Sequence, residues 1–270
     1  MRKSKLPFLI IGIVLIAFFV FMAIFPQVFT SYGRKESFDA WIQPCLQHPL
    51  GTNSLGYDVF TELVYAARET LLIGIVSGIL SLFLGAIIGI LAYNKGFIGS
   101  IFNGLVNIFV LIPKLVVLIV ISSFITNSQI NSILLISLFG WAATARNVRA
   151  KVIHIKSQPF IENCKIYGLS KAHITVKHII PNLYDVLLSR FLIGVNSCIM
   201  MESTLSFLGL GNIYYPTWGS MINFAYTRGA MIHESYLYLL IPCICIMLLS
   251  LAFYFIAIYI DNSKNTINNV

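Results

Sequence analysis

The residues of this chain that could do chemistry are its few histidines, cysteines and charged groups, and their spacing forms neither a catalytic centre nor a metal centre. Cys243 and Cys245 are two positions apart in an apolar run, so on a helix they would face different sides. His173 and His178 are five positions apart, whereas two metal ligands on one helical face need a spacing of about four. Cys198 is interpreted as a packing residue. We therefore predict no catalytic residue and no metal site.

Nucleotide-binding and hydrolase motifs are also missing from the sequence. No G-x-x-x-x-G-K-[ST] segment is present to cradle a phosphate. Neither H-E-x-x-H nor G-x-S-x-G occurs, so an intramembrane metalloprotease or a serine hydrolase has no support. We expect that the chain is not an enzyme and binds no cofactor of its own.

Lys114, Glu202 and Ser206 lie in apolar stretches and are candidates for a pathway through a membrane. An ionisable side chain at membrane depth is costly and is by default a functional hypothesis. Other interpretations stay open. Lys114 could extend its ammonium group to the membrane surface or pair with Glu202, and Glu202 could serve as a structural hydrogen-bond acceptor.

The composition indicates which elements must position these residues. Of the 270 residues, 58% are apolar and 10% are charged, and the net charge is +8. About a quarter of the residues of a soluble domain are charged, so the solvent of this chain must be mostly lipid. The high hydrophobicity excludes a disordered chain. Five cysteines in 270 residues exclude a secreted disulfide scaffold.

Charge-free apolar runs predict six membrane-spanning helices, because about 20 residues suffice to cross the hydrocarbon core. The polar stretch 126–129 divides the long run 101–145 into a third span and a short fourth span. The fold class is therefore an all-α polytopic membrane protein. Its expected spans are 6–25, 71–93, 101–125, 130–145, 187–208 and 237–260.

Basic residues in the loops predict the orientation, because Lys and Arg collect on the cytoplasmic side. With both termini in the cytoplasm, thirteen of them lie inside and four outside, and Lys114 lies within a span. The segment 146–190 holds eight basic and two acidic residues, which is +6 of the net charge of +8. The positive excess is thus an orientation signal, and we expect no nucleic-acid partner.

The most informative part of the cytoplasmic segment 146–190 begins with a short amphipathic helix. Phe160, Cys164 and Tyr167 fall on one face of this helix. Gly168 stands where a helix usually ends through a left-handed residue. The spacing therefore predicts a helix that turns sharply at this glycine.

A second short helix is expected to follow the glycine. Ser170 suits its N-cap, and Pro181 implies a kink or break. Its expected apolar stripe consists of Ala172, Val176, Ile179, Ile180 and Leu183. The residues alone leave two interpretations open. The segment could dock on a partner, or it could rest on headgroups with its lysines attracted to anionic lipid.

This segment resembles the cytoplasmic coupling motif of binding-protein-dependent ABC importer permeases, in which a Glu is followed six residues later by Gly and then by His-x-x-Pro-Asn. Three further blocks, all in order, narrow the resemblance to the C-type permeases of dipeptide, oligopeptide and nickel importers. The matching residues are Glu162, Gly168 and 178–182, then 48–58 with 67–71, Trp141 with 145–146 and 148–150, and Glu202 with 205–211 and 216–219.

The resemblance implies a type I ABC importer permease fold that forms half of a translocation channel in a bacterial plasma membrane. Its partners would be a homologous second permease in a heterodimer, two cytoplasmic ABC ATPase subunits that use ATP and Mg²⁺, and an extracellular substrate-binding protein. The substrates would be peptides, nickel or metal chelates. The residues that would couple to the ATPase are Glu162, Asn163, Cys164, Lys165, Gly168, Ala172, His178, Pro181 and Asn182.

Three features depart from the family pattern. Asn163 and Cys164 stand where the motif has two alanines, and Tyr57 stands where the family commonly has Arg. The tail 261–270 lacks the Asp-rich, Arg-containing ending that is usual in the family. The choice of ATPase and the role of the tail therefore stay open.

The expected organisation has four parts, and a rival function of a different class remains. The parts are an anchor helix at 1–30, an extracellular loop at 31–69, a permease core at 70–260 and a cytoplasmic tail at 261–270. The rival is a self-contained channel or secondary transporter, which would need buried charges on several spans or an inverted repeat. The ordered motif blocks disfavour both this rival and a purely structural anchor.

Overall fold

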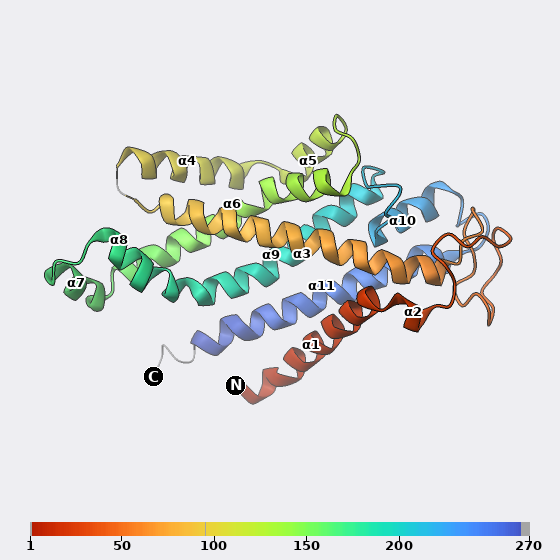
Figure 1. Cartoon of the computed structure of the whole chain (residues 1–270), viewed down its shortest axis with the longest axis horizontal. Helices are drawn as coiled ribbons and strands as arrows, with labels where there is room; N and C mark the ends of the chain where they lie inside the picture. The colour runs from red at the N-terminus through yellow and green to blue at the C-terminus, as the bar shows by residue number, and fades with distance from the viewer. Residues whose placement is uncertain (1, 95, 266–270) are drawn as a thin grey trace.

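Helices form the regular structure of the computed structural model, which describes residues 2–94 and 96–265 (Figure 1). Lys95, one of the basic residues expected inside, and the end of the tail lie outside the described residues. The elements are α1 (Arg2–Ile24), α2 (Pro26–Phe29), α3 (Val59–Leu91), α4 (Phe97–Leu111), α5 (Lys114–Ser122), α6 (Gln129–Lys156), α7 (Pro159–Ile166), α8 (Lys171–Ile174), a π-helical turn (Thr175–Ile179), a 3₁₀ turn (Pro181–Leu183), α9 (Tyr184–Phe207), α10 (Trp218–Thr227) and α11 (Tyr236–Asn265).

Helix α3 starts well before the apolar run that predicted the second span at 71–93. Asp58 caps it, because its carboxylate accepts the Thr61 amide at 2.7 Å. His48 Nδ1 lies 2.9 Å from the other oxygen of this carboxylate and holds it in place. The helix thus begins in the segment expected to be a loop, and its first turns carry polar residues such as Glu62.

The third expected span is not one continuous helix. Helices α4 and α5 meet at an angle of 84°, and Lys114 is the first residue of α5, directly after the break. Pro113 causes the break, because a residue before proline is driven out of the helical region. Ile112 accordingly has an extended ψ of 131°.

By length and composition, four described helices could cross a membrane, and the bent pair α4–α5 would make a fifth. The four are Leu6–Ile24, Val59–Leu91, Pro181–Phe207 and Tyr236–Asp261. Helix α6, which contains the expected fourth span, is not among them, because its apolar part lies between polar residues at 129–131 and the basic end that starts at Arg146. The count of six spans therefore stays a prediction.

Gly74, Gly78, Gly85 and Gly89 of α3 repeat at small-xxx-small spacing, which predicts close packing against neighbouring helices. A Cβ at Gly78 would lie 2.5 Å from a methyl group of Val195 on α9. A Cβ at Gly85 would lie 2.6 Å from Cβ of Thr144 on α6. The helix-packing interpretation of these glycines is confirmed, and α3 is the central helix between α6 and α9.

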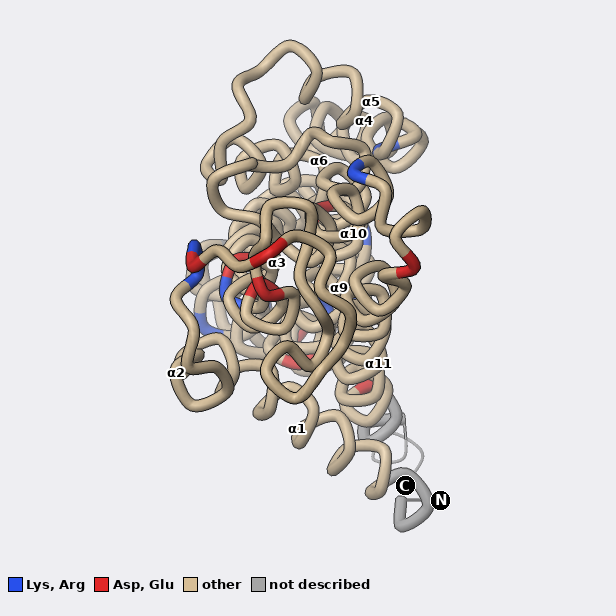
Figure 2. The backbone as a smooth tube through the Cα atoms, turned by 90° about the vertical axis from the view of Figure 1, so that its right-hand side faces the viewer, with Lys and Arg blue, Asp and Glu red and all other residues tan. Residues whose placement is uncertain are grey.

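The molecule has two distinct ends (Figure 1). Helices α7 and α8 lie at one end, and the start of α1 and the end of α11 point toward the same side. The segment 30–58 and α10 lie at the opposite end, which we call the loop end. Figure 2 looks onto the loop end and shows acidic and basic positions gathered around the start of α3, on a tube that is otherwise mostly tan.

Candidate functional site

Helix α7 ends at Gly168 in the geometry that the sequence predicts. Gly168 has a φ of +73°, the left-handed region that favours glycine. The Leu169 amide donates to the Cys164 carbonyl at 3.1 Å, and the Gly168 amide donates to the Lys165 carbonyl at 3.0 Å. This pair of bonds is the Schellman motif, which satisfies the last carbonyls of a helix. The glycine therefore turns the chain sharply between α7 and α8.

Helix α7 packs on α6 through Ile161, a residue that the sequence pattern did not single out. Ile161 is fully buried and Cys164 half-buried, and both pack on the apolar cluster at the end of α6. Phe160 and Tyr167, expected beside Cys164, are exposed. Because α7 rests on α6 through Ile161, Phe160 and Tyr167 stay on the surface.

The second short helix is confirmed in its start and its break. Ser170 Oγ accepts the His173 amide at 3.2 Å, so it caps α8. Pro181 begins the 3₁₀ turn that leads into α9. The Asn182 side-chain amide donates to the His178 carbonyl at 2.7 Å across this break.

The apolar stripe expected on the second helix is wrong at three positions. Ile179 and Leu183 are buried against α6, but the third contact is Ile174, which was not expected. The reason is the π-helical turn, whose bonds connect residues five apart, as in the bond from the Ile180 amide to the Thr175 carbonyl. This turn shifts the register, and it leaves Ala172, Val176 and Ile180 exposed.

Most of the nine residues predicted to couple to an ATPase lie on the surface of this one end. Cys164 and His178 are half-buried, and the other seven are exposed. Three exposed apolar residues that the sequence pattern missed extend the same surface, namely Ile166, Leu169 and Tyr184. Phe160, Tyr167, Val176 and Ile180, which the pattern included, are exposed as well.

Glu202, Ser206 and Thr217 form a buried polar cluster between α9 and the start of α10. Glu202 is 2% exposed. Its Oε1 accepts the hydroxyls of Ser206 at 2.6 Å and Thr217 at 2.7 Å. Thr217 Oγ1 in turn accepts the Ser220 amide at 3.3 Å and caps α10. The geometry fits the structural interpretation of Glu202, because hydroxyl groups satisfy its carboxylate.

Lys114 is half-buried at the bend between α4 and α5. The ion pair with Glu202 that the sequence left open is absent, since no ion pair joins the two described side chains. Lys114 and the cluster around Glu202 are therefore separate features, and a role of Lys114 in a pathway stays a prediction.

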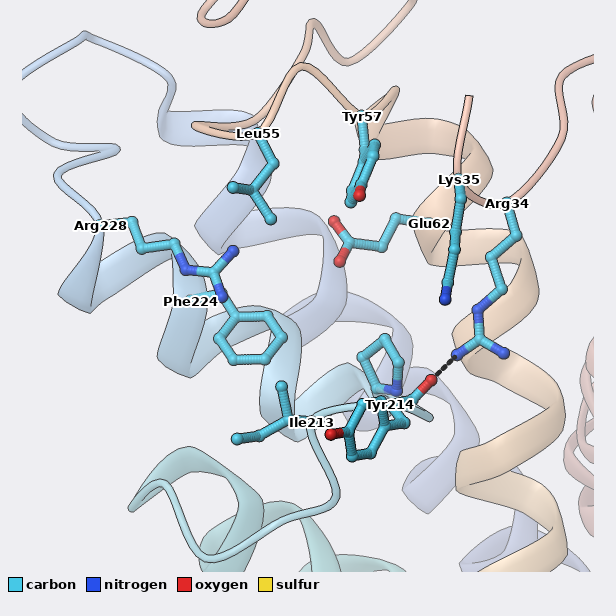
Figure 3. Close-up of a pocket in the computed structure, with 10 residues that line it drawn as sticks. Arg34, Lys35, Leu55, Tyr57, Glu62, Ile213, Tyr214, Phe224 and Arg228 are labelled. Carbon is cyan, nitrogen blue, oxygen red and sulfur yellow. Dashed lines mark hydrogen bonds between the residues drawn. The ribbon is translucent and has the colours of Figure 1, made fainter. Parts of the chain in front are cut away.

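The loop end contains a concave site, a cavity of about 180 Å³. Its walls come from four parts of the chain, namely the segment after α2, the first turn of α3, the segment 209–217 and the end of α10 (Figure 3). Trp218 fastens α10 to α3, because its indole Nε1 donates to the Leu63 carbonyl at 3.0 Å. Tyr57, a departure from the family pattern, lines this cavity. Sequence reasoning missed the site because its residues come from distant segments.

Comparisons with known proteins match most of the chain to one family. The family model described as "Binding-protein-dependent transport system inner membrane component" matches residues 81–265. The dipeptide transport system permease protein DppC of Alkalihalophilus pseudofirmus is 30% identical over 227 residues, which cover 83% of this chain and 74% of that protein. The oligopeptide transport system permease protein OppC of Bacillus subtilis is 29% identical, covering 82% of this chain and 73% of that protein.

A third relative and one solved structure agree with this family. The glutathione transport system permease protein GsiD of Escherichia coli is 29% identical, covering 87% of this chain and 78% of that protein. A chain of the inward-facing MetNI methionine ABC transporter has a TM-score of 0.56 and 21% identity, and the match covers 73% of this chain and 95% of that chain. The latter likeness supports the type I ABC importer permease fold. The chain belongs to the family of binding-protein-dependent transport system inner membrane components, and within it the chain is similar to the C-type permeases.

Proposed function

We propose that this chain is a permease subunit of an ATP-driven importer, and that it couples to a separate ATPase through residues 160–182. The observation that carries the coupling proposal is the α7–Gly168–α8 turn, which presents exposed side chains beyond the end of α6. A fixed turn of this kind transmits a push from a partner to α6 and α9, because Ile161, Ile179 and Leu183 pack on the same cluster.

In this proposal the chain has six spans with both termini in the cytoplasm. Helix α6 provides the span that length and composition alone do not support, because its packing against α3 shields its polar groups. A homologous second permease completes the channel, two ATPase subunits bind at the α7–α8 end, and an extracellular substrate-binding protein delivers the substrate to the loop end. The ATPase subunits, not this chain, use ATP and Mg²⁺.

Peptides are the substrate class that we propose. Relatives named for dipeptide, oligopeptide and glutathione transport support this choice. Nickel and metal chelates also occur among the substrates of the family that the sequence resembles. None of the relatives named above is named for nickel transport. The charges of the cavity at the loop end, described below, agree with a peptide.

Co-purification tests the proposal against the rival of a self-contained channel. A tagged chain should bring down a second permease and an ATPase from its native membrane. The variant Tyr167→Glu should lose the ATPase, because this side chain is 83% exposed at the α7–α8 end and a charge there opposes apolar docking. Tyr214→Glu is the matched control, since Tyr214 is 78% exposed at the loop end. Recovery of the chain without any ATPase would contradict the proposal.

A further inference from the structure

The cavity at the loop end has charged side chains of both signs on its walls (Figure 3). Glu62 projects from the first turn of α3, with Arg228 on one side and Arg34 and Lys35 on the other. These residues are far apart in the sequence, and only the fold brings them together. With three cations and one carboxylate, the walls have a net charge of +2.

The charges in this cavity are not paired with one another. Among the described residues, no carboxylate oxygen lies within 4.0 Å of a nitrogen of Arg34, Lys35 or Arg228. Glu36, the nearest acid along the chain, accepts the Gly33 amide at 2.9 Å. The carboxylate of Glu62 accepts the Asn53 side-chain amide at 3.1 Å, and the Tyr238 hydroxyl lies beside it.

Neutral groups hold the two guanidinium groups in place. Arg34 donates to the Tyr214 carbonyl at 3.3 Å and lies 5.4 Å from the ring centroid of Tyr215. The Arg228 guanidinium carbon lies 4.2 Å from the ring centroid of Phe224. Such contacts fix the direction of a cation and leave its charge available to a ligand. Both arginines are thus oriented without being neutralised.

We propose that this cavity binds the zwitterionic form of a short peptide, with the free amino group at Glu62 and the free carboxylate at one of the two arginines that flank it, Arg34 or Arg228. A ligand with only a carboxylate would leave the Glu62 carboxylate without a partner. A ligand with only an amino group would leave the three cations without a partner. A ligand that carries both signs satisfies both sets. The apolar and aromatic walls provided by Leu55, Tyr57, Ile213, Pro216 and Phe224 accommodate a side chain between the two ends.

This inference rests on the proposed function for its substrate class and on the proposed topology for its access from outside. The cavity would be the first site on this chain that a peptide meets after release from the delivering protein. It also gives Tyr57 a role, because an uncharged phenol at this position lines the cavity without adding a fourth cation.

Binding of four probe peptides to the full chain in lipid nanodiscs tests the inference. The probes are Gly-Leu, N-acetyl-Gly-Leu, Gly-Leu amide and the peptide blocked at both ends, titrated by saturation-transfer NMR. The N-acetyl group and the C-terminal amide each remove one charge-assisted contact. Each singly blocked peptide should therefore bind about tenfold more weakly than Gly-Leu. Higher salt should weaken the binding of Gly-Leu, because the contacts lie near the surface.

Variants assign each end of the peptide to its contact. Glu62→Gln should abolish the preference for a free amino group and keep the preference for a free carboxylate. Of Arg34→Gln and Arg228→Gln, the variant that removes the contact with the carboxylate should weaken the preference for a free carboxylate and keep the preference for a free amino group. Arg68→Gln, an exposed arginine of α3 outside the cavity, is the matched control and should behave as the unaltered chain does. A merely structural role of these residues would not produce such group-specific losses.

Two outcomes would overturn the inference. One is equal binding of the free and the doubly blocked peptide, and the other is no binding of Gly-Leu at all. Because this measurement uses the chain without ATPase, its failure is distinct from failure of the proposed function. If the transporter co-purifies and imports peptides while the isolated chain does not bind Gly-Leu, only the assignment of the cavity is wrong.

Discussion

At the scale of single residues, a carboxylate inside an apolar bundle is costly unless its oxygens accept hydrogen bonds. Glu202 meets this condition through the hydroxyls of Ser206 and Thr217. Gly168 is a different case, because its value lies in a backbone conformation and not in a side chain. Its positive φ allows the two short helices to meet at a sharp angle on the surface.

Gly168→Val should leave the chain inserted and folded but uncouple ATP hydrolysis from transport. No atom lies within 4 Å of a Cβ at this position, so the cost is backbone strain of about 1–2 kcal/mol, confined to the turn. Substrate-stimulated hydrolysis and uptake by purified complexes measure the effect. Gly104→Val is the control, because its Cβ also meets no atom within 4 Å and its φ is not positive. Retention of both activities in Gly168→Val would refute the docking role.

At the scale of elements, the packing of α3 against α6 and α9 requires small side chains where the backbones approach. Gly78 and Gly85 occupy such positions, and a Cβ at Gly85 would also lie 2.8 Å from the Trp141 carbonyl oxygen. The long charge-free apolar run of the sequence identifies α3 as a helix, and the spacing of its glycines identifies a packing face. It does not indicate which neighbour each glycine meets, because that depends on the path of the chain between helices.

Gly85→Val should therefore destabilise the folded chain. Overpacking a close helix contact costs about 1–3 kcal/mol, because α3 and α6 must separate or strain their rotamers. The measurement is the midpoint temperature of unfolding in detergent, with the fraction of protein that stays monodisperse as the readout. Gly104→Val, where the added methyl groups meet open space, should keep the midpoint of the unaltered chain. Equal midpoints for both variants would show that α3 and α6 do not pack as described.

At the scale of the whole molecule, the cysteines report which end faces which side of the membrane. Cys45 is exposed in the segment before α3 at the loop end, and Cys164 is half-buried in α7 at the opposite end. With the proposed orientation, an impermeant thiol reagent should label Cys45 in intact cells and Cys164 only after the membrane is opened. The variants Cys45→Ser and Cys164→Ser assign each signal. The reverse pattern would invert the topology and place α7 and α8 outside.

The sequence by itself determined the lipid-embedded helical class, the glycine turn after α7 and the family. Hydropathy, charge bias and a cap are properties of short stretches of chain, so they are visible without a fold. Only the tertiary structure decided that Pro113 bends α4 and α5 by 84°, that a π-helical turn moves the buried face to Ile174, and that Arg34, Glu62 and Arg228 share one cavity. Contacts between distant segments depend on how helices pack and where the backbone departs from regular period, and neither can be read from local pattern.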